Sequence, residues 1–199
     1  MTECPIIGYN MDRNIGYYIG GYGLYGVYSF RLNAVNDSYN ISNGFELINM
    51  VETSYIDGIY SCNGPGNVMT NNVIYWVSFN DSTYIHLNMF DIKNESILLD
   101  VNRFPNDNDI CDVSSNPCLL TNGEYIYLLC QSNAYYFDLN GELFSYINQS
   151  QYDHTNGTCV WYNDIIVSIS GTHTNKVEYL SNYIWYTCSK ELPNSISNS

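Results

Sequence analysis

Short runs of apolar residues alternate along the chain with polar turns that are rich in asparagine. Four segments share one pattern, in which two apolar runs flank a turn asparagine: residues 5–10, 68–77, 118–129 and 159–168. The turn residues are Asn10, Asn71, Asn122 and Asn163. Asn-Asn, Asn-Gly and Asn-Asp turns favour the positive backbone angles of a tight hairpin. Each segment therefore predicts two antiparallel strands.

Two further strands are predicted after each hairpin, which makes four strands per repeat. The third strands span residues 27–33, 87–93, 134–140 and 177–181, and the fourth span residues 45–48, 96–99, 142–146 and 183–186. Successive turn asparagines are 61, 51 and 41 positions apart, close to the length of one four-stranded propeller blade. The pattern predicts an all-β fold, a small β-propeller of about four four-stranded blades.

The repeat also sets the predicted domain organisation. One domain is expected over residues 1–199, with repeats at about 5–50, 66–101, 117–147 and 158–188 and a polar tail at 189–199. Polar runs at residues 33–44, 102–117 and 147–157 are predicted to be exposed loops between strands or blades. A β-sandwich, in which the strands form two packed sheets, is the alternative.

The first repeat resembles a kelch repeat. Its apolar strand ends in a glycine pair at Tyr18–Gly21, a tyrosine-bearing strand follows at Val27–Phe30, and the next strand is Phe45–Ile48. The glycine pair is present only in the first repeat, and the tryptophan of the family's last strand is matched only in the fourth, at Trp185. The resemblance implies propeller architecture.

Closure of the ring is a separate question for a propeller of four repeats. The chain is similar in size to the four-bladed hemopexin-like fold and, like it, has a cysteine near each end. That resemblance implies a disulfide between Cys4 and Cys188, which would join the first blade to the last. If the ring does not close within the chain, another subunit would have to cover or pair with its exposed edge strands.

The composition narrows the class of partner. The chain has 21 tyrosines, and 20 acidic residues against 6 basic ones give a formal net charge of −14. Such a charge opposes binding to nucleic acid. No apolar stretch is long enough to span a membrane, so membrane insertion is not expected. A protein partner or a homo-oligomer is predicted, with a glycan as a further ligand class. Tyr17, Tyr22 and Tyr25 cluster in one hairpin and are the predicted binding surface.

Cysteines and glycosylation motifs bear on the compartment. Cys4, Cys188, Cys111 and Cys118 are the disulfide candidates among seven cysteines. Six Asn-x-Ser/Thr motifs, about as many as chance placement gives, lie at Asn36, Asn40, Asn80, Asn94, Asn148 and Asn156. An extracellular or cell-surface location is predicted. A cytoplasmic location is the alternative, because the sequence shows no signal peptide.

One run of residues is a candidate metal site. Asp107, Asp109 and Asp112 lie in an Asn/Asp-rich segment that offers hard oxygen ligands for calcium. The segment lacks the glycine and the distal glutamate of an EF-hand loop, so a solvated polar turn is the alternative. No other cofactor is predicted.

Catalysis is not expected. His86, His154 and His173 lie on or beside different repeats and are predicted to be isolated surface residues. The sequence has no Gly-x-Ser-x-Gly motif, phosphate-binding glycine loop or sialidase aspartate box. The predicted function is a non-catalytic interaction or structural module, extracellular, glycosylated and self-associating. The alternative is a carbohydrate-binding or carbohydrate-active propeller, either lectin-like or a hydrolase.

Overall fold

All regular structure in the described part of the chain is β-strand. The computed structural model describes residues 6–10, 15–19, 26–32, 45–52, 67–70, 72–78, 84–105, 111, 117–139 and 144–193. These residues form four antiparallel sheets of four strands each, which we number 1 to 4 in chain order. The strands therefore make four sheets, not the two sheets of a β-sandwich.

The four strands of each sheet are consecutive in sequence. Sheet 1 contains β1 (Ile6–Asn10), β2 (Ile15–Ile19), β3 (Gly26–Leu32) and β4 (Phe45–Glu52). Sheet 2 contains β5 (Asn67–Met69), β6 (Val73–Ser78), β7 (Tyr84–Asp91) and β8 (Ser96–Pro105). Sheet 3 contains β9 (Cys118–Thr121), β10 (Tyr125–Cys130), β11 (Asn133–Asp138) and β12 (Phe144–Gln149). Sheet 4 contains β13 (Thr158–Tyr162), β14 (Ile165–Gly171), β15 (Thr174–Ser181) and β16 (Ile184–Thr187).

Asparagines form two of the hairpin turns as their sequence context predicts. In the turn from β9 to β10, Asn122 Oδ1 accepts hydrogen bonds from the backbone N–H groups of Glu124 (3.0 Å) and Tyr125 (2.8 Å). In the turn from β13 to β14, Asn163 and Asp164 have φ angles of 47° and 61°. Two successive positive angles characterise the type I′ turn, which matches the twist of a hairpin.

Each of the four sheets contains a register shift, in addition to having the same strand order. In sheets 1, 2 and 3 the register shifts between the third and fourth strands, at Ser29/Phe30, Leu87/Met89 and Ala134/Tyr135. In sheet 4 the shift lies between β14 and β15, at Ile169/Gly171. Such bulges change the direction of side chains along a strand. The internal repeat thus includes the position of the register shift in sheets 1 to 3, and sheet 4 differs from them in this position.

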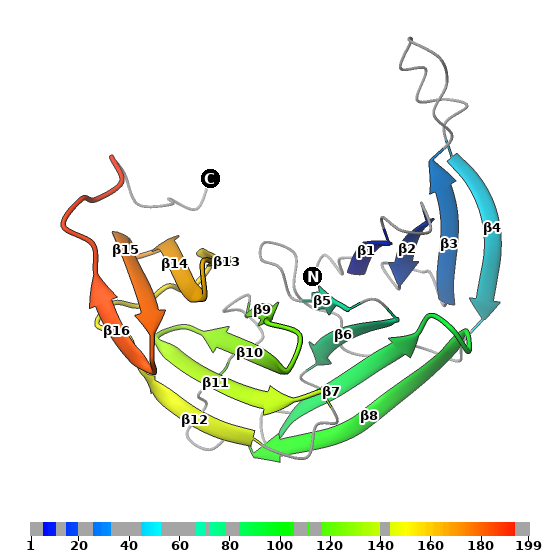
Figure 1. Ribbon diagram of the computed structural model, residues 1–199, viewed down its shortest axis with the longest axis horizontal. Helices are drawn as coiled ribbons and strands as arrows, with labels where there is room; N and C mark the ends of the chain where they lie inside the picture. The colour runs from blue at the N-terminus through cyan, green and yellow to red at the C-terminus, as the bar shows by residue number, and fades with distance from the viewer. Residues whose placement is uncertain are drawn as a thin grey trace, which may run out of the picture.

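The sheets are arranged along an arc, with the first strand of each sheet toward the centre and the fourth on the outside (Figure 1). The innermost strands follow one another in the order β1, β5, β9 and β13, and each contacts the next. No contact of similar extent joins β13 to β1 in the described residues. The arc is open between sheet 4 and sheet 1 (Figure 1).

Apolar side chains fill the space between neighbouring sheets. Tyr17 and Ile19 of sheet 1 pack with Ile74, Trp76 and Phe90 of sheet 2. A second cluster lies between sheets 2 and 3, and a third between sheets 3 and 4. Full burial of one large apolar side chain contributes about 1.5–3 kcal/mol. These layers are therefore the main source of stability.

The strands of an interior sheet bury both of their faces. In β10, Ile126 and Leu128 belong to the cluster shared with sheet 2, whereas Tyr127 and Leu129 belong to the cluster shared with sheet 4. Because successive side chains of a strand point to opposite faces, a strand between two sheets is apolar at every position.

Two disulfides reinforce this packing. Cys118 of β9 is bonded to Cys159 of β13, with 6.2 Å between the Cα atoms, and so joins the innermost strands of sheets 3 and 4. Cys111 is bonded to Cys130 of β10, with 5.4 Å between the Cα atoms. Cys111 and Cys118, both candidates from the sequence, are therefore in disulfides. Such bonds persist in an oxidising environment.

Two runs predicted to be exposed loops contribute to the fold instead. Residues 102–105 extend β8, and residues 147–149 complete β12. Beyond β12, Ser150 and His154 are buried where the chain passes from sheet 3 to sheet 4. Ser150 and His154 are thus used for internal hydrogen bonds, whereas Arg103, Asn148 and Gln149 are exposed. The predicted loop at 33–44 lies outside the described residues.

Candidate interaction face of sheet 4

Sheet 4 has one covered side and one open side. Along β14, Ile166, Ser168 and Ser170 are buried, whereas Ile165 and Val167 are only partly buried. Ile166 belongs to the apolar cluster shared with sheet 3. Because side chains alternate along a strand, Ile165 and Val167 point away from sheet 3, toward the open end of the arc.

Cross-strand pairing extends this open side over the whole sheet. Val160, Val167, Tyr179 and Tyr186 pair in one row across the four strands. The same side also carries Thr158, Tyr162, Ile165, Ile169, Val177, Ser181 and Ile184. The rings of Tyr179 and Tyr186 stack with their centroids 5.1 Å apart. We call this set of residues the outer face of sheet 4.

The outer face of sheet 4 is apolar, accessible and uncharged. The exposed fraction is 63% for Tyr162, 52% for Ile184 and 43% for both Val160 and Tyr186. None of its residues is charged, although the chain has a net charge of −14. Glu178, in the middle of β15, lies on the covered side and is fully buried. Contiguous exposed apolar residues of this kind mark interaction surfaces on soluble proteins.

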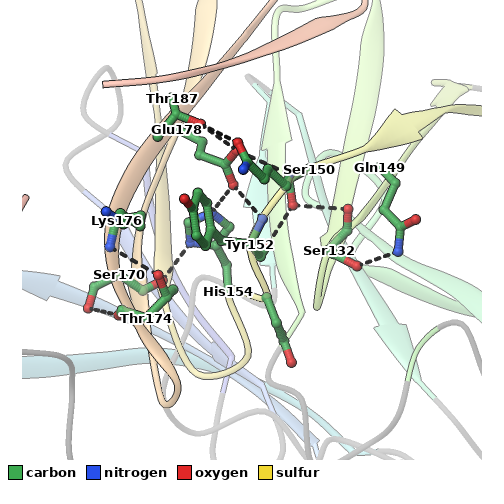
Figure 2. Close-up of polar contacts among 12 residues, drawn as sticks. Ser132, Gln149, Ser150, Tyr152, His154, Ser170, Thr174, Lys176, Glu178 and Thr187 are labelled. Atoms are coloured by element: carbon green, nitrogen blue, oxygen red, sulfur yellow. Dashed lines mark hydrogen bonds and ion pairs between the residues drawn. The ribbon is translucent and has the colours of Figure 1, made fainter. Parts of the chain in front are cut away.

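The covered side is braced by hydrogen bonds to the carboxylate of Glu178 (Figure 2). Its Oε1 accepts from the backbone N–H of Gln151 (3.1 Å) and from the Thr187 hydroxyl (3.2 Å). Its Oε2 accepts from the backbone N–H of Tyr152 (3.1 Å) and from His154 Nε2 (2.9 Å). Residues 151–154 belong to the connection from β12 to β13, so Glu178 ties that connection to β15 and β16.

His154 extends the network to a further backbone group. Its Nδ1 lies 2.7 Å from the carbonyl oxygen of Ser170, and its Nε2 faces Glu178. Because both ring nitrogens face acceptors, the geometry matches an imidazolium that donates from both. Glu178 is 0% exposed and His154 is 8% exposed. The two form a buried hydrogen-bonded pair, which is an ion pair when His154 is protonated, and the nitrogen and oxygen atoms of both side chains have partners.

This arrangement suits a structural brace. The polar atoms of Glu178 and His154 are engaged by the protein itself, and neither side chain is placed to reach a substrate. Within the described part of the chain, no group of three or more His, Cys, Asp or Glu residues could hold a metal ion. Nor do the described residues include a helix long and apolar enough to cross a membrane.

The binding surface predicted around Tyr17 is not where the structure places accessible aromatic groups. Tyr17 is 5% exposed, and its ring contacts that of Phe90 with 5.9 Å between centroids. The prediction for Tyr17 is wrong because the alternation of β2 directs this side chain into the space between sheets 1 and 2. The other predicted residues, Tyr22, Tyr25, Asp107, Asp109 and Asp112, lie outside the described residues, so the calcium site stays a prediction.

Two histidines and one cysteine also differ from expectation. His86 and His154 are buried, and only His173 is exposed as predicted for all three. Cys188 is a free thiol, so the structure does not form the predicted link to Cys4, which itself lies outside the described residues. The Cys188 N–H bonds to the Val177 carbonyl oxygen beside β15, at the open end of the arc.

The glycosylation candidates fall into different surroundings. Asn94 is exposed in the turn from β7 to β8, and Asn148 is exposed near the end of β12. Asn156 is partly buried and its Nδ2 donates to Thr172 Oγ1 at 2.9 Å. Asn36, Asn40 and Asn80 lie outside the described residues.

Sequence patterns alone identified neither the outer face of sheet 4 nor the Glu178 brace. The face does have a signal, because Ile165–Ile169 is apolar on both sides of the strand although only one side is covered. The brace has none, since the donors to Glu178 include two backbone N–H groups 26 and 27 residues away.

Comparisons with known proteins place the chain by its fold. No family model and no curated protein sequence matches it. Among solved structures, it is similar to YjhT, with a TM-score of 0.66 and 10% identity over 97% of this chain and 67% of the other. It is also similar to a chain of the Nidogen/Laminin complex, with a TM-score of 0.60 and 10% identity over 94% of this chain and 62% of the other. Hsv2p of Kluyveromyces lactis has a TM-score of 0.52 and 15% identity over 96% of this chain and 51% of the other.

The chain thus spans between about half and two thirds of the length of these structures. The Nidogen/Laminin and YjhT structures are of the β-propeller type. At 10–15% identity the likeness concerns the fold alone. The four sheets of this chain therefore form a β-propeller-type arrangement, open between its last and first sheets.

Proposed function

We propose that this chain is a non-catalytic β-propeller module that binds another protein through the outer face of sheet 4. One observation carries the proposal: the outer face of sheet 4 is uncharged and mostly apolar, and four of its apolar side chains are exposed, on a chain of net charge −14. Tyrosine, which supplies three residues of this face, is enriched at protein interfaces, whereas most charged residues are depleted at their cores. One similar structure belongs to the Nidogen/Laminin complex, so a fold of this type takes part in a protein assembly.

Photo-crosslinking tests this proposal. With p-benzoylphenylalanine in place of Tyr186, irradiation in the producing cells is expected to give adducts to a polypeptide several-fold more often than the same residue in place of Tyr146. Tyr146 is the matched control because it is an exposed tyrosine, at 52%, on the outermost strand of sheet 3. Equal adduct yields at the two positions would show that the outer face of sheet 4 is ordinary surface.

The proposed location is extracellular or at the cell surface. It is supported by the disulfides Cys111–Cys130 and Cys118–Cys159, because such bonds are rare in reducing compartments. Glycosylation belongs to the same proposal. It would attach a bulky, solvated group to an asparagine side chain.

Glycan occupancy should follow the surroundings of each motif. When the chain passes through a eukaryotic secretory pathway, we expect folded, secreted protein to carry a glycan at Asn94 and little or none at Asn156. Each amide donates one side-chain hydrogen bond, Asn94 to Asp91 and Asn156 to Thr172, but Asn94 is exposed in a turn, whereas Asn156 is partly buried. Glycopeptide mass spectrometry measures both sites, and an Asn94→Gln variant identifies the glycan at the first. An unoccupied Asn94 beside an occupied Asn156 would contradict the expectation.

A carbohydrate ligand is the second candidate. It is favoured by the exposed rings of Tyr162 and Tyr186, because tyrosine combines a flat apolar face with a hydrogen-bonding tip. The outer face of sheet 4 offers few polar groups besides Thr158 and Ser181, however, so a protein fits it better. A glycan array separates the two, since binding lost on a Tyr162→Ala change would support the carbohydrate.

A further inference from the structure

Neighbouring sheets in this chain always pack in the same way. Each interior sheet packs one face against the preceding sheet and the opposite face against the following sheet. In β6, Ile74 and Trp76 face sheet 1, whereas Tyr75 and Val77 belong to the cluster shared with sheet 3. The strand β10 repeats this alternation between sheets 2 and 4. In the second strand of each interior sheet, alternate residues therefore contact the preceding sheet and the following sheet.

Two sides have no partner among the four described sheets: the side of sheet 4 that faces away from sheet 3 and the side of sheet 1 that faces away from sheet 2. The first is the outer face of sheet 4. On the second, Gly16 pairs with Phe30 and Tyr18 pairs with Tyr28, on the side of β2 opposite Tyr17. We call Gly16, Tyr18, Tyr28 and Phe30 the outer face of sheet 1.

The outer face of sheet 1 resembles that of sheet 4 in chemistry. The rings of Tyr18 and Tyr28 meet edge to face, with 6.3 Å between centroids. The Phe30 ring occupies the space that a side chain at Gly16 would need. The four residues are uncharged and rich in aromatic rings, like the outer face of sheet 4. These four residues and the outer face of sheet 4 would bury no charge against each other, so the two suit direct contact, and Glu52 pairs with Gly26 at the end of the same side of sheet 1.

We propose that the outer face of sheet 4 binds the outer face of sheet 1 in a second copy of this chain, head to tail. This inference rests on the proposed function and names its partner. Between copies, this contact would repeat the packing of one sheet on the next, which occurs three times within the chain. Two such contacts give a twofold ring of eight sheets, within the range of four to eight blades typical of propellers.

The length of one solved neighbour matches that of two copies of this chain. Nearly the whole chain overlays 51% of the Hsv2p chain, so two copies together have about the length of that chain. The overlaps of 62% and 67% with the other two structures leave about a third of each chain uncovered, a length that a partner smaller than this chain would supply. That partner would leave the purified chain monomeric, so mass in solution separates the two.

Light scattering on the purified full chain, at micromolar concentrations, is the test. We expect a mass of twice 22.8 kDa. Val160→Asp and Tyr28→Asp should each weaken the dimer at least about a hundredfold, because either change buries an unpaired carboxylate in the contact. Leu98→Asp should leave it unchanged. Leu98 is the matched control because it is 44% exposed, against 43% for Val160, but lies on β8 of sheet 2.

Mixing the two defective variants tests the direction of the contact. A pair formed from Val160→Asp and Tyr28→Asp copies keeps one intact contact, so the mixture should dimerise more strongly than either variant alone. Far-UV circular dichroism and thermal melting establish that each variant is folded. Should Tyr28→Asp prove unfolded, Tyr186→Asp gives a second test of the sheet 4 side, and Tyr18→Ser a milder test of the sheet 1 side.

Several outcomes overturn the inference. A monomeric wild-type chain overturns it, while polypeptide adducts from position 186 to a different protein would still support the proposed function. A dimer that survives Tyr28→Asp but not Val160→Asp overturns the head-to-tail contact in favour of sheet 4 packing on itself. Open-ended polymers instead of a dimer overturn the closed ring. Absence of both a dimer and crosslinks removes the inference and the proposed function together.

Discussion

Replacing Glu178 with leucine is expected to lower the free energy of unfolding by about 3–5 kcal/mol, the usual cost of breaking a buried ion pair by removing one partner. The change leaves four hydrogen-bond donors without their acceptor, including the backbone N–H groups of Gln151 and Tyr152. It also leaves His154 Nε2 buried beside a leucine in place of its carboxylate partner. Urea denaturation followed by tyrosine and tryptophan fluorescence measures the loss.

Two amide variants show whether burial is the cause. Glu178→Gln keeps one acceptor oxygen but places an amide NH₂ against other donors, so an intermediate loss is expected. Glu191→Gln is the control, because Glu191 pairs with Lys176 at the exposed surface. There, solvent screens the interaction, and stability should change little. Equal effects of Glu178→Gln and Glu191→Gln would mean that the Glu178 network does not brace the sheet.

Local sequence patterns predicted the repeat because the physics of a hairpin is local. Asn122 closes its turn with N–H groups two and three residues away, and Asn163 and Asp164 adopt positive φ angles as adjacent residues. The whole topology follows from such turns, since every sheet consists of consecutive strands. Four repeats of four strands could therefore be predicted without knowledge of any distant contact.

The Glu178 brace could not be predicted for the opposite reason. In sequence, Glu178 follows Val177 and precedes Tyr179, an alternation that suggests an exposed polar position. Its acceptor atoms are instead satisfied by residues in the connection between sheets 3 and 4 and by Thr187. Backbone donors leave no mark in a sequence, so the burial of this carboxylate becomes visible only in the fold.

The local sequence also does not determine which face of a sheet is covered by a neighbouring sheet. Tyr17 looked like a surface residue because five tyrosines lie close together in sequence, but β2 directs it toward Phe90 of the next sheet. Val167 of β14, in contrast, occupies a position like that of buried Tyr127 in β10, yet none of the four described sheets covers it. The residue pattern of a strand shows that both of its faces are apolar. Which of the two faces is covered depends on the position of the sheet in the arc.

Removal of the disulfide between Cys118 and Cys159, by Cys118→Ala with Cys159→Ala, is expected to cost about 4 kcal/mol, because the bond closes a loop of 41 residues in the unfolded chain. Since the bond joins β9 to β13, the loss should be greatest in sheet 4. Hydrogen exchange should therefore show faster opening of β13–β16 than of β5–β8. Cys188→Ala, which removes a free thiol, is the control and should change stability little.

Combining this change with Glu178→Leu tests whether the two features hold the same contact. The disulfide and the Glu178 network both fasten sheet 4 to sheet 3 or to the connection that leads from it. If sheet 4 already opens first in the disulfide-free chain, Glu178→Leu removes fewer remaining contacts and causes a smaller further loss of stability. The combined loss should be smaller than the two single losses added, as for residues that act on one element. Strict additivity would show that the two support different parts of the fold, and hydrogen exchange of β13–β16 would identify which one governs sheet 4.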